Sequence, residues 1–234
     1  PLQQAMQDVF GHGGGDYAQI RAQLYLTNGP YANPYELVTF YDNHDMKRLD
    51  ASDQGFIDAN NFLFTTRGIP ALYYGSETGF ERGRGEHQGN RNYYGQARID
   101  GADKSPIYRA LRRIARLRAA SPALQRGLML VLEMQGDRAA FYRVYQHAGQ
   151  HQIALVLLNK GKHATDFHVA QLLQAGSWRP AFGGTAVQVS DGGVLDVTVG
   201  AHDAAVYLLD AAATQPALVR ALDKAQAERG RPLH

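Results

Sequence analysis

Cysteine is absent from the 234 residues of this chain. Its absence excludes a disulfide framework and any thiolate metal site, and it leaves the redox compartment open. No apolar run approaches the roughly 20 residues that a membrane span needs. Net charge is also small, +2 from 24 Lys and Arg against 22 Asp and Glu. We therefore expect neither a nucleic acid nor a membrane as a partner.

An initiator methionine and a signal-peptide pattern are missing from the start of the sequence. Pro1 leads directly into residues 2–10, which have the pattern of a helix with proline at its first turn. Because the chain starts inside a structural element, we expect it to be part of a longer polypeptide. Its hydrophobic content of 44% is sufficient for a folded core.

Helical and extended patterns alternate through the first half of the sequence. Helices are predicted at 2–10, 17–27, 53–67 and 106–120, and short apolar strands at 36–41 and 69–74. Because helix, strand, helix and strand follow one another, this order indicates parallel strands with crossover helices. Both strands run into polar residues, Asn43-His44-Asp45 after the first and Ser76-Glu77 after the second.

The hydrophobic period changes from helical to two-residue after residue 122. Strands are predicted at 128–134, 139–146, 151–158, 165–169, 186–189, 194–199 and 204–209. Short strands at this spacing, separated by turn signals, are typical of an antiparallel sandwich. We therefore expect an α/β part over residues 1–122, an all-β sandwich over 123–210 and a helical tail over 211–234.

The polar residues at the two strand ends form the candidate site, because strand ends of a closed α/β barrel meet on one face. His44 beside Asp45 suits an acid/base pair, a metal site or a clamp on sugar hydroxyls, and a loop cap explains the tripeptide equally well. No second histidine stands nearby at metal-ligand spacing. The long loop 78–104 favours sugar, because tyrosine rings stack on sugar faces and arginine forks bind hydroxyls.

A second polar feature is the basic face of the predicted helix 106–120. Opposite its apolar stripe lie Arg109, Arg112, Arg113 and Arg116. Such a face is able to bind nucleic acid or phosphate. With so small a net charge, a solvated helix surface is the preferred interpretation.

Two stretches resemble the α-amylase family, glycoside hydrolase family 13. Residues 40–45, FYDNHD, with Arg48 three residues later, resemble the family's fourth characteristic stretch. Residues 68–77, GIPALYYGSE, resemble its eighth barrel strand, and the two are one helix apart. Residues 42–46 and 89–91 are further similar to the cyclodextrin glucanotransferase and α-amylase branches.

The resemblance extends over residues 1–210. Residues 141–145, FYRVY, then 153–159, IALVLLN, and then Trp178 follow the order of the family's C-terminal domain. The resemblance therefore implies the C-terminal part of a (β/α)8 TIM barrel, with strands seven and eight, followed by an antiparallel β-sandwich.

The resemblance also implies a retaining mechanism on α-1,4-glucans such as starch, maltodextrin and cyclodextrin. In this mechanism one carboxylate forms a glycosyl-enzyme and one carboxylic acid protonates the leaving oxygen. A third acid of the family grips hydroxyls of the sugar being cleaved, and Asp45 matches it as the catalytic residue. The substrate-binding residues implied are His44, Asn43, Arg48 and Arg91, with Phe80, Tyr93 and Tyr94 as candidate stacking platforms.

The stretches that carry the family's nucleophile and general acid have no match in this sequence. The family's calcium ligands also lie upstream, so we expect no metal and no cofactor in this chain and leave calcium to the full-length enzyme. A half barrel has open sheet edges, so we expect the missing N-terminal half or a second copy as a partner. The localisation is unknown from the residues, and the resemblance favours a secreted or periplasmic enzyme.

Three interpretations stay open. The chain is part of a glucan hydrolase or transglycosylase that is inactive by itself, or a truncated non-catalytic module that binds α-glucan or a partner protein. The third is a structural or interaction domain built on the sandwich alone.

Overall fold

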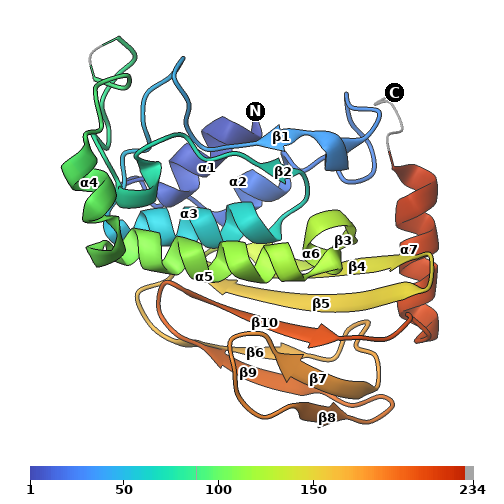
Figure 1. Ribbon diagram of the computed structural model, residues 1–234. Helices are drawn as coiled ribbons and strands as arrows, with labels where there is room; N and C mark the ends of the chain where they lie inside the picture. The colour runs from blue at the N-terminus through green and yellow to red at the C-terminus, as the bar shows by residue number, and fades with distance from the viewer. Residues whose placement is uncertain (88, 230–234) are drawn as a thin grey trace.

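The computed structural model describes residues 1–87 and 89–229 and arranges them in three layers (Figure 1). Helices cover one face of a six-stranded sheet, and a two-stranded sheet covers the other. Within the described part of the chain, no helix combines the length and apolar character needed to cross a bilayer.

The helical layer follows the sequence pattern, except that the helix predicted at 17–27 ends at Arg21. It consists of α1 (Leu2–Phe10), α2 (Tyr17–Arg21), α3 (Asp53–Thr65), α5 (Pro106–Ala120) and the unpredicted α6 (Pro122–Arg126). The side chains of Asp16, Ser52 and Ser105 accept hydrogen bonds from backbone N–H groups in the first turns of α2, α3 and α5. These caps satisfy N–H groups that have no partner within the helix, so they fix where each helix begins.

The two N-terminal strands pair in parallel, as predicted, but over a shorter length. β1 (Val38–Thr39) lies beside β2 (Ile69–Pro70). The predicted six-residue strands shorten to two residues because, in the described chain, each strand has only the other as a neighbour. Val38 and Ile69 stay 58% and 54% exposed. A closed barrel around this pair stays a prediction.

The six-stranded sheet has the order β3-β4-β5-β10-β7-β8 and is antiparallel throughout. Its strands are β3 (Leu128–Gln135), β4 (Arg138–His147), β5 (Gln150–Asn159), β7 (Gly176–Pro180), β8 (Val187–Val189) and β10 (Asp203–Leu209). The fully apolar β5 is central, as predicted. The sequence pattern missed β7, which carries the fully buried Trp178.

Each face of this sheet has its own apolar core. One core joins Phe56 and Phe62 of α3 to Phe141 and Val156 of the sheet. The other packs β6 (Thr165–Val169) and β9 (Leu195–Val199) against the opposite face. This pair of sheets confirms the predicted sandwich. The division of the chain at residue 122 stays a prediction, since the first core includes residues from both sides of it.

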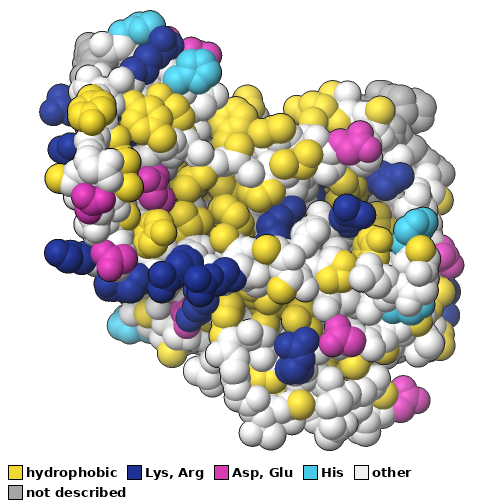
Figure 2. All heavy atoms as spheres, viewed as in Figure 1, with side chains coloured by type: hydrophobic (Ala, Val, Ile, Leu, Met, Phe, Trp, Pro, Cys, Tyr) yellow, Lys and Arg dark blue, Asp and Glu magenta, His cyan; other side chains and the backbone are white. Residues whose placement is uncertain are grey.

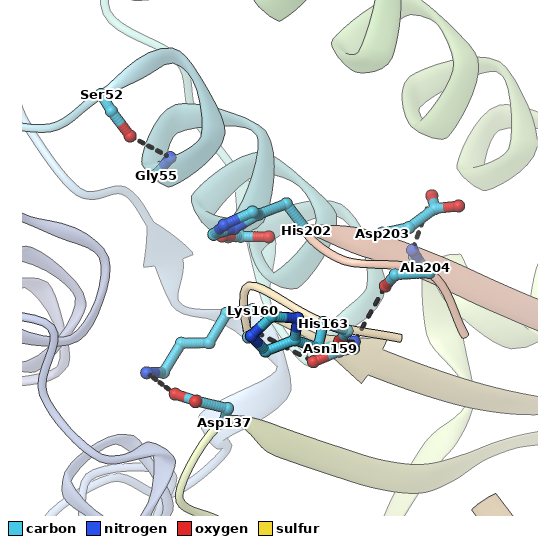
Figure 3. Close-up of polar contacts among 12 residues, drawn as sticks. Ser52, Gly55, Asp137, Asn159, Lys160, His163, His202, Asp203 and Ala204 are labelled. Atoms are coloured by element: carbon cyan, nitrogen blue, oxygen red, sulfur yellow. Dashed lines mark hydrogen bonds and ion pairs between the residues drawn. The ribbon is translucent and has the colours of Figure 1, made fainter. Parts of the chain in front are cut away.

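Polar side chains also join the helical layer to the sheet. Arg143 of β4 is buried and donates to the carbonyl oxygens of Thr65, Thr66 and Gly127. Across the same seam, the His202 imidazole lies over α3 in Figure 3, with its Nδ1 2.7 Å from Oδ2 of the buried Asp58. These directional polar contacts add to the apolar packing that joins the helical layer to the sheet.

Several short elements lie in segments predicted as loop. They are η1 (Pro34–Glu36), η2 (Ser76–Thr78), α4 (Gln96–Asp100) and η3 (Ala102–Lys104). The predicted terminal helix is α7 (Pro216–Glu228), with Leu218 and Leu222 buried as expected. The end of the predicted tail, residues 230–234, lies outside the described residues.

Candidate functional site

The polar ends of the two parallel strands are joined by hydrogen bonds. The hydroxyl of Ser76, at the start of η2 in the segment that follows β2, donates to both carboxylate oxygens of Asp42, at 3.0 and 3.1 Å. Asp42 also accepts from the backbone N–H of Leu49. The two strand ends therefore lie side by side, as the sequence argument expected for parallel strands.

Arg48 is the buried centre of this region. Its guanidinium donates to the carbonyl oxygens of Tyr74 at 2.9 Å and Asn90 at 3.1 Å. Its Cζ also lies 4.6 Å from the ring centroid of Tyr73 and 5.3 Å from that of Phe80. The structure thus places Arg48 beneath the surface, where a planar fork holds the second strand end and the following loop together.

Asn43, His44 and Asp45 form an exposed turn above this buried centre. The Asn43 side-chain oxygen accepts the backbone N–H of Asp45 at 2.8 Å, an Asx turn that fixes the carboxylate's direction. His44 Nε2 lies 3.1 Å from one oxygen of Asp45, and an Arg91 nitrogen lies 2.9 Å from the other. The Asp45 side chain is 62% exposed, so it is open to a ligand from solvent.

Asn90 connects the loop to this turn, and the sequence argument gave it no role. It is fully buried, and its amide donates to the carbonyl oxygens of His44 at 2.8 Å and Met46 at 2.9 Å. Its neighbour Arg91 donates to the same His44 carbonyl at 3.1 Å. The stretch Gly89-Asn90-Arg91 was noted for its similarity to the family, but the sequence alone did not show that the asparagine holds the turn through hydrogen bonds.

Aromatic side chains form one wall of the site. Phe80 packs edge-on against Tyr94 with ring centroids 5.1 Å apart, and the Tyr94 hydroxyl lies 2.7 Å from that of Thr78. Gly75 permits this packing, since its φ is +85° and a Cβ there would lie 2.8 Å from Phe80. Tyr93 is 86% exposed. Phe80 and Tyr94 are thus half-buried wall residues, while Tyr93 presents a free ring.

Asp42 and Asp45, the two aspartates that follow β1, lie in different electrostatic environments. Burial raises the pKa of Asp42, opposed by its hydrogen bonds from Leu49 and Ser76 and by the charge of Arg48. Asp42 is therefore a structural acceptor inside the loop, whereas Asp45 is the solvent-facing carboxylate. Among the described residues no group of three His, Cys, Asp or Glu side chains is placed to hold a metal ion.

Chemically, the turn offers one exposed carboxylate between an imidazole and a guanidinium. The carboxylate accepts hydrogen bonds, and the two neighbours donate them, which suits several hydroxyl groups on one ligand. The Tyr73 ring, whose centroid lies 6.4 Å from that of His44, adds an aromatic surface beside these groups that suits a sugar ring. The arrangement brings Asn43, His44, Asp45 and Arg91 together and leaves Arg48 below them.

Comparisons with known proteins find similar sequences and similar structures. No family model matches the chain. The cyclomaltodextrin glucanotransferase of Thermoanaerobacterium thermosulfurigenes is 27% identical over 224 residues, 91% of this chain and 30% of that protein. The α-amylase of Streptomyces lividans is 31% identical over 160 residues, 55% of this chain and 17% of that protein.

Solved structures give the same relationship. A cyclomaltodextrin glucanotransferase with a three-domain ABC distribution matches with a TM-score of 0.71 and 30% identity, covering 90% of this chain and 43% of that one. The Geobacillus thermoleovorans α-amylase complexed with acarbose matches in fold with a TM-score of 0.74 at 24% identity, covering 89% of this chain and 46% of that chain.

This chain is therefore homologous to part of α-amylase-family enzymes, and the resemblance drawn from the two motifs is confirmed. The chain spans about a third or less of the length of these two curated relatives.

Proposed function

We propose that this chain is one portion of a retaining glycosidase or transglycosylase that acts on α-1,4-glucans. Asp45 is its transition-state-stabilising acid, and the residues around the turn bind the sugar. The observation that carries the proposal is the exposed Asp45 carboxylate, held between His44 and Arg91 at the joined ends of two parallel strands. The names of the homologous enzymes support the substrate class.

The Asp45 environment suits a transition-state role. A carboxylate that accepts two sugar hydroxyls binds more tightly as the ring flattens and positive charge develops at the reacting carbon. His44 and Arg91 fix the carboxylate before substrate arrives, so little reorganisation is needed during the reaction. Asn43 and Asn90 position the same turn through the backbone.

In this proposal the nucleophile and general acid come from outside residues 1–234. The chain by itself then binds glucan without cleaving it. The exposed Val38 and Ile69 on the β1–β2 pair suit contact with further barrel strands, supplied by an N-terminal portion or by a second copy. Closure of such a barrel would place the missing carboxylates on the same face as Asp45.

The test compares two aspartate variants in the polypeptide that carries this chain together with its barrel partner. Asp45→Asn is expected to lower kcat on maltoheptaose by about a hundredfold or more, as loss of a preorganised transition-state group does. Asp223→Asn, an exposed change on α7, is the matched control. Unchanged turnover in Asp45→Asn would remove the role given to this residue.

A second candidate is a non-catalytic α-glucan-binding module, which the single exposed carboxylate of the tip favours. Maltoheptaose titrated into residues 1–234 tests binding, and release of reducing ends from starch tests hydrolysis. The enzyme-portion proposal expects binding here and cleavage only after the barrel partner is added. Binding with no cleavage under either condition would favour the module.

A further inference from the structure

The basic face of α5 borders a hollow that the proposed glucan site does not use. The hollow has a volume of about 560 Å³ and lies between α5 and the sheet strands β7 and β10. Figure 2 shows Lys and Arg side chains gathered along α5 at this place. The arginines that line the hollow are Arg109, Arg112, Arg113 and Arg116 of α5 and Arg179 of β7.

Two of these five arginines are compensated by carboxylates. Arg113 lies 2.7 Å from an oxygen of Asp203, and Arg179 lies 3.3 Å from an oxygen of Asp210. Arg109 instead donates to the backbone carbonyl oxygens of Asp103 and Lys104. It therefore keeps its full positive charge.

The remaining two, Arg112 and Arg116, have no hydrogen bond or ion pair in the described structure. They are four residues apart and therefore neighbours on the helix surface. The sequence of α5 contains no Asp or Glu that would separate these like charges. Like charges at this spacing destabilise a helix. A bound anion would relieve this repulsion.

The floor of the hollow is apolar. It includes Leu117, Ala181, Phe182 and Leu208. The guanidinium carbon of Arg113 lies 4.0 Å from the ring centroid of Phe182, which fixes that ring against α5. A ligand here meets cationic forks along one side and a flat apolar surface beneath.

We propose that this hollow binds a compact oligophosphate, either free or carried by a small molecule. Guanidinium forks match phosphate oxygens in a bidentate geometry, and Arg112 and Arg116 are available for it because no carboxylate of the described residues pairs with them. The hollow is bordered by α5 on one side and by β7 and β10 on the other, and Asp203 and Asp210 beside its lining arginines disfavour an extended polyanion beyond it. A small ligand therefore fits better than a nucleic acid.

The experiment measures tripolyphosphate binding to the full chain by calorimetry and by phosphorus NMR. The test variant is Arg112→Gln/Arg116→Gln, because glutamine keeps helix propensity close to that of arginine. The matched control is Arg220→Gln/Lys224→Gln, which removes two exposed cations at the same spacing on α7. Far-UV circular dichroism and the melting temperature show whether each variant is folded.

We expect saturable binding to the wild type, at least tenfold weaker binding to Arg112→Gln/Arg116→Gln, and less than a twofold change in the control. Arg112→Lys/Arg116→Lys keeps the charge and loses the forks, so it should fall between wild type and the glutamine variant. Adenosine triphosphate separates the two sources: tighter binding than tripolyphosphate indicates a carried phosphate, and equal binding a free one.

Three results would overturn the proposal. The first is the absence of any tripolyphosphate binding at millimolar concentration in low salt. The second is equal loss of binding in the α5 and α7 double variants, which indicates general attraction to positive charge. The third is α5-dependent binding of a DNA duplex without tripolyphosphate binding, which assigns the face to nucleic acid.

Discussion

Different interactions stabilise the six-stranded sheet and the strand-tip region, which consists of β1, β2 and the polar residues after them, within residues 42–48 and 76–91. β1 and β2 are two residues long and leave Val38 and Ile69 exposed. β4 and β5 are ten residues long, and each has a neighbour on both edges. The sheet is stabilised by apolar burial on both faces, whereas the strand tip is stabilised by polar contacts to one buried arginine.

The residues that stabilise the chain most and the residues that are able to bind a ligand are therefore different ones. The sheet side chains that stabilise most are buried and unable to meet a ligand. In the strand-tip region His44, Asp45 and Arg91 lie at the surface, and the buried Arg48 and Asn90 beneath them hold the backbone in place. Substitutions in the two regions should therefore affect different measurements.

The largest expected effect is in the sheet, at Trp178. This side chain is fully buried, and its indole N–H donates to the Gln174 carbonyl oxygen at 2.9 Å. Trp178→Ala should lower the free energy of unfolding by about 4 kcal/mol through the cavity and the lost hydrogen bond. Urea denaturation measures it, with Val187→Ala on the neighbouring, exposed position as control. A loss below about 1 kcal/mol would contradict two-faced burial as the source of stability.

Arg48 gives the next effect, because it does for the strand tip what apolar packing does for the sheet. Arg48→Ala leaves the Tyr74 and Asn90 carbonyl oxygens without their donor and should cost about 3 kcal/mol. Arg84→Ala, an exposed change in the loop that carries Asn90, is the control. If both variants unfold at the same urea concentration, the strand tip does not depend on its buried cation.

A pH effect is expected where α3 of the helical layer meets the sheet, at Asp58 and His202. Burial raises the pKa of Asp58 to about 7, in spite of its hydrogen bond to His202. The folded chain then holds this proton from about pH 4 to 7, where the unfolded chain has released it. Stability from this group is therefore fully present below about pH 4 and is lost as the pH rises through 7.

Asp58→Asn should remove that component from the pH dependence of the free energy of unfolding. Urea denaturation at several pH values between 4 and 8 measures it. Asp191→Asn, in an exposed turn, should keep the wild-type slope. A wild type whose stability rises throughout this interval would show that Asp58 is ionised in the fold.

The smallest effect on stability is expected at Asp45. Its ion pairs are exposed, and exposed pairs contribute little. Asp45→Asn should change the free energy of unfolding by less than about 0.5 kcal/mol, while it impairs glucan turnover in the polypeptide that carries the barrel. A loss above about 2 kcal/mol would make Asp45 a structural residue and erase the contrast with the sheet.

Local signals predicted much of this fold. Ser52 and Ser105 mark helix starts, the alternation of Phe167 and Val169 marks a half-buried strand, and the apolar β5 is central. Strand β7 was missed because Trp178 stands among glycine, serine and proline, and its burial depends on residues distant in the sequence, such as Tyr142 of β4. The length of β1 and β2 was overestimated because a strand needs a neighbour to pair with.

The strand-tip motif was also readable from the sequence, since Asn43, His44 and Asp45 are adjacent. Arg91 lies 46 residues from Asp45, and only folding brings its guanidinium to 2.9 Å from the carboxylate. The roles of Asp42, Ser76 and Asn90 depend on burial, which no single stretch reveals.

By itself, the sequence determined the helix starts, the change from helices to strands near residue 122 and the motifs of the α-amylase family. These features depend on neighbouring residues or on a short period. Tertiary structure alone decided that Arg48 is buried, that Asp45 is exposed, and that Arg112 and Arg116 have no carboxylate partner among the described residues. Those outcomes depend on which distant side chains arrive beside each charge.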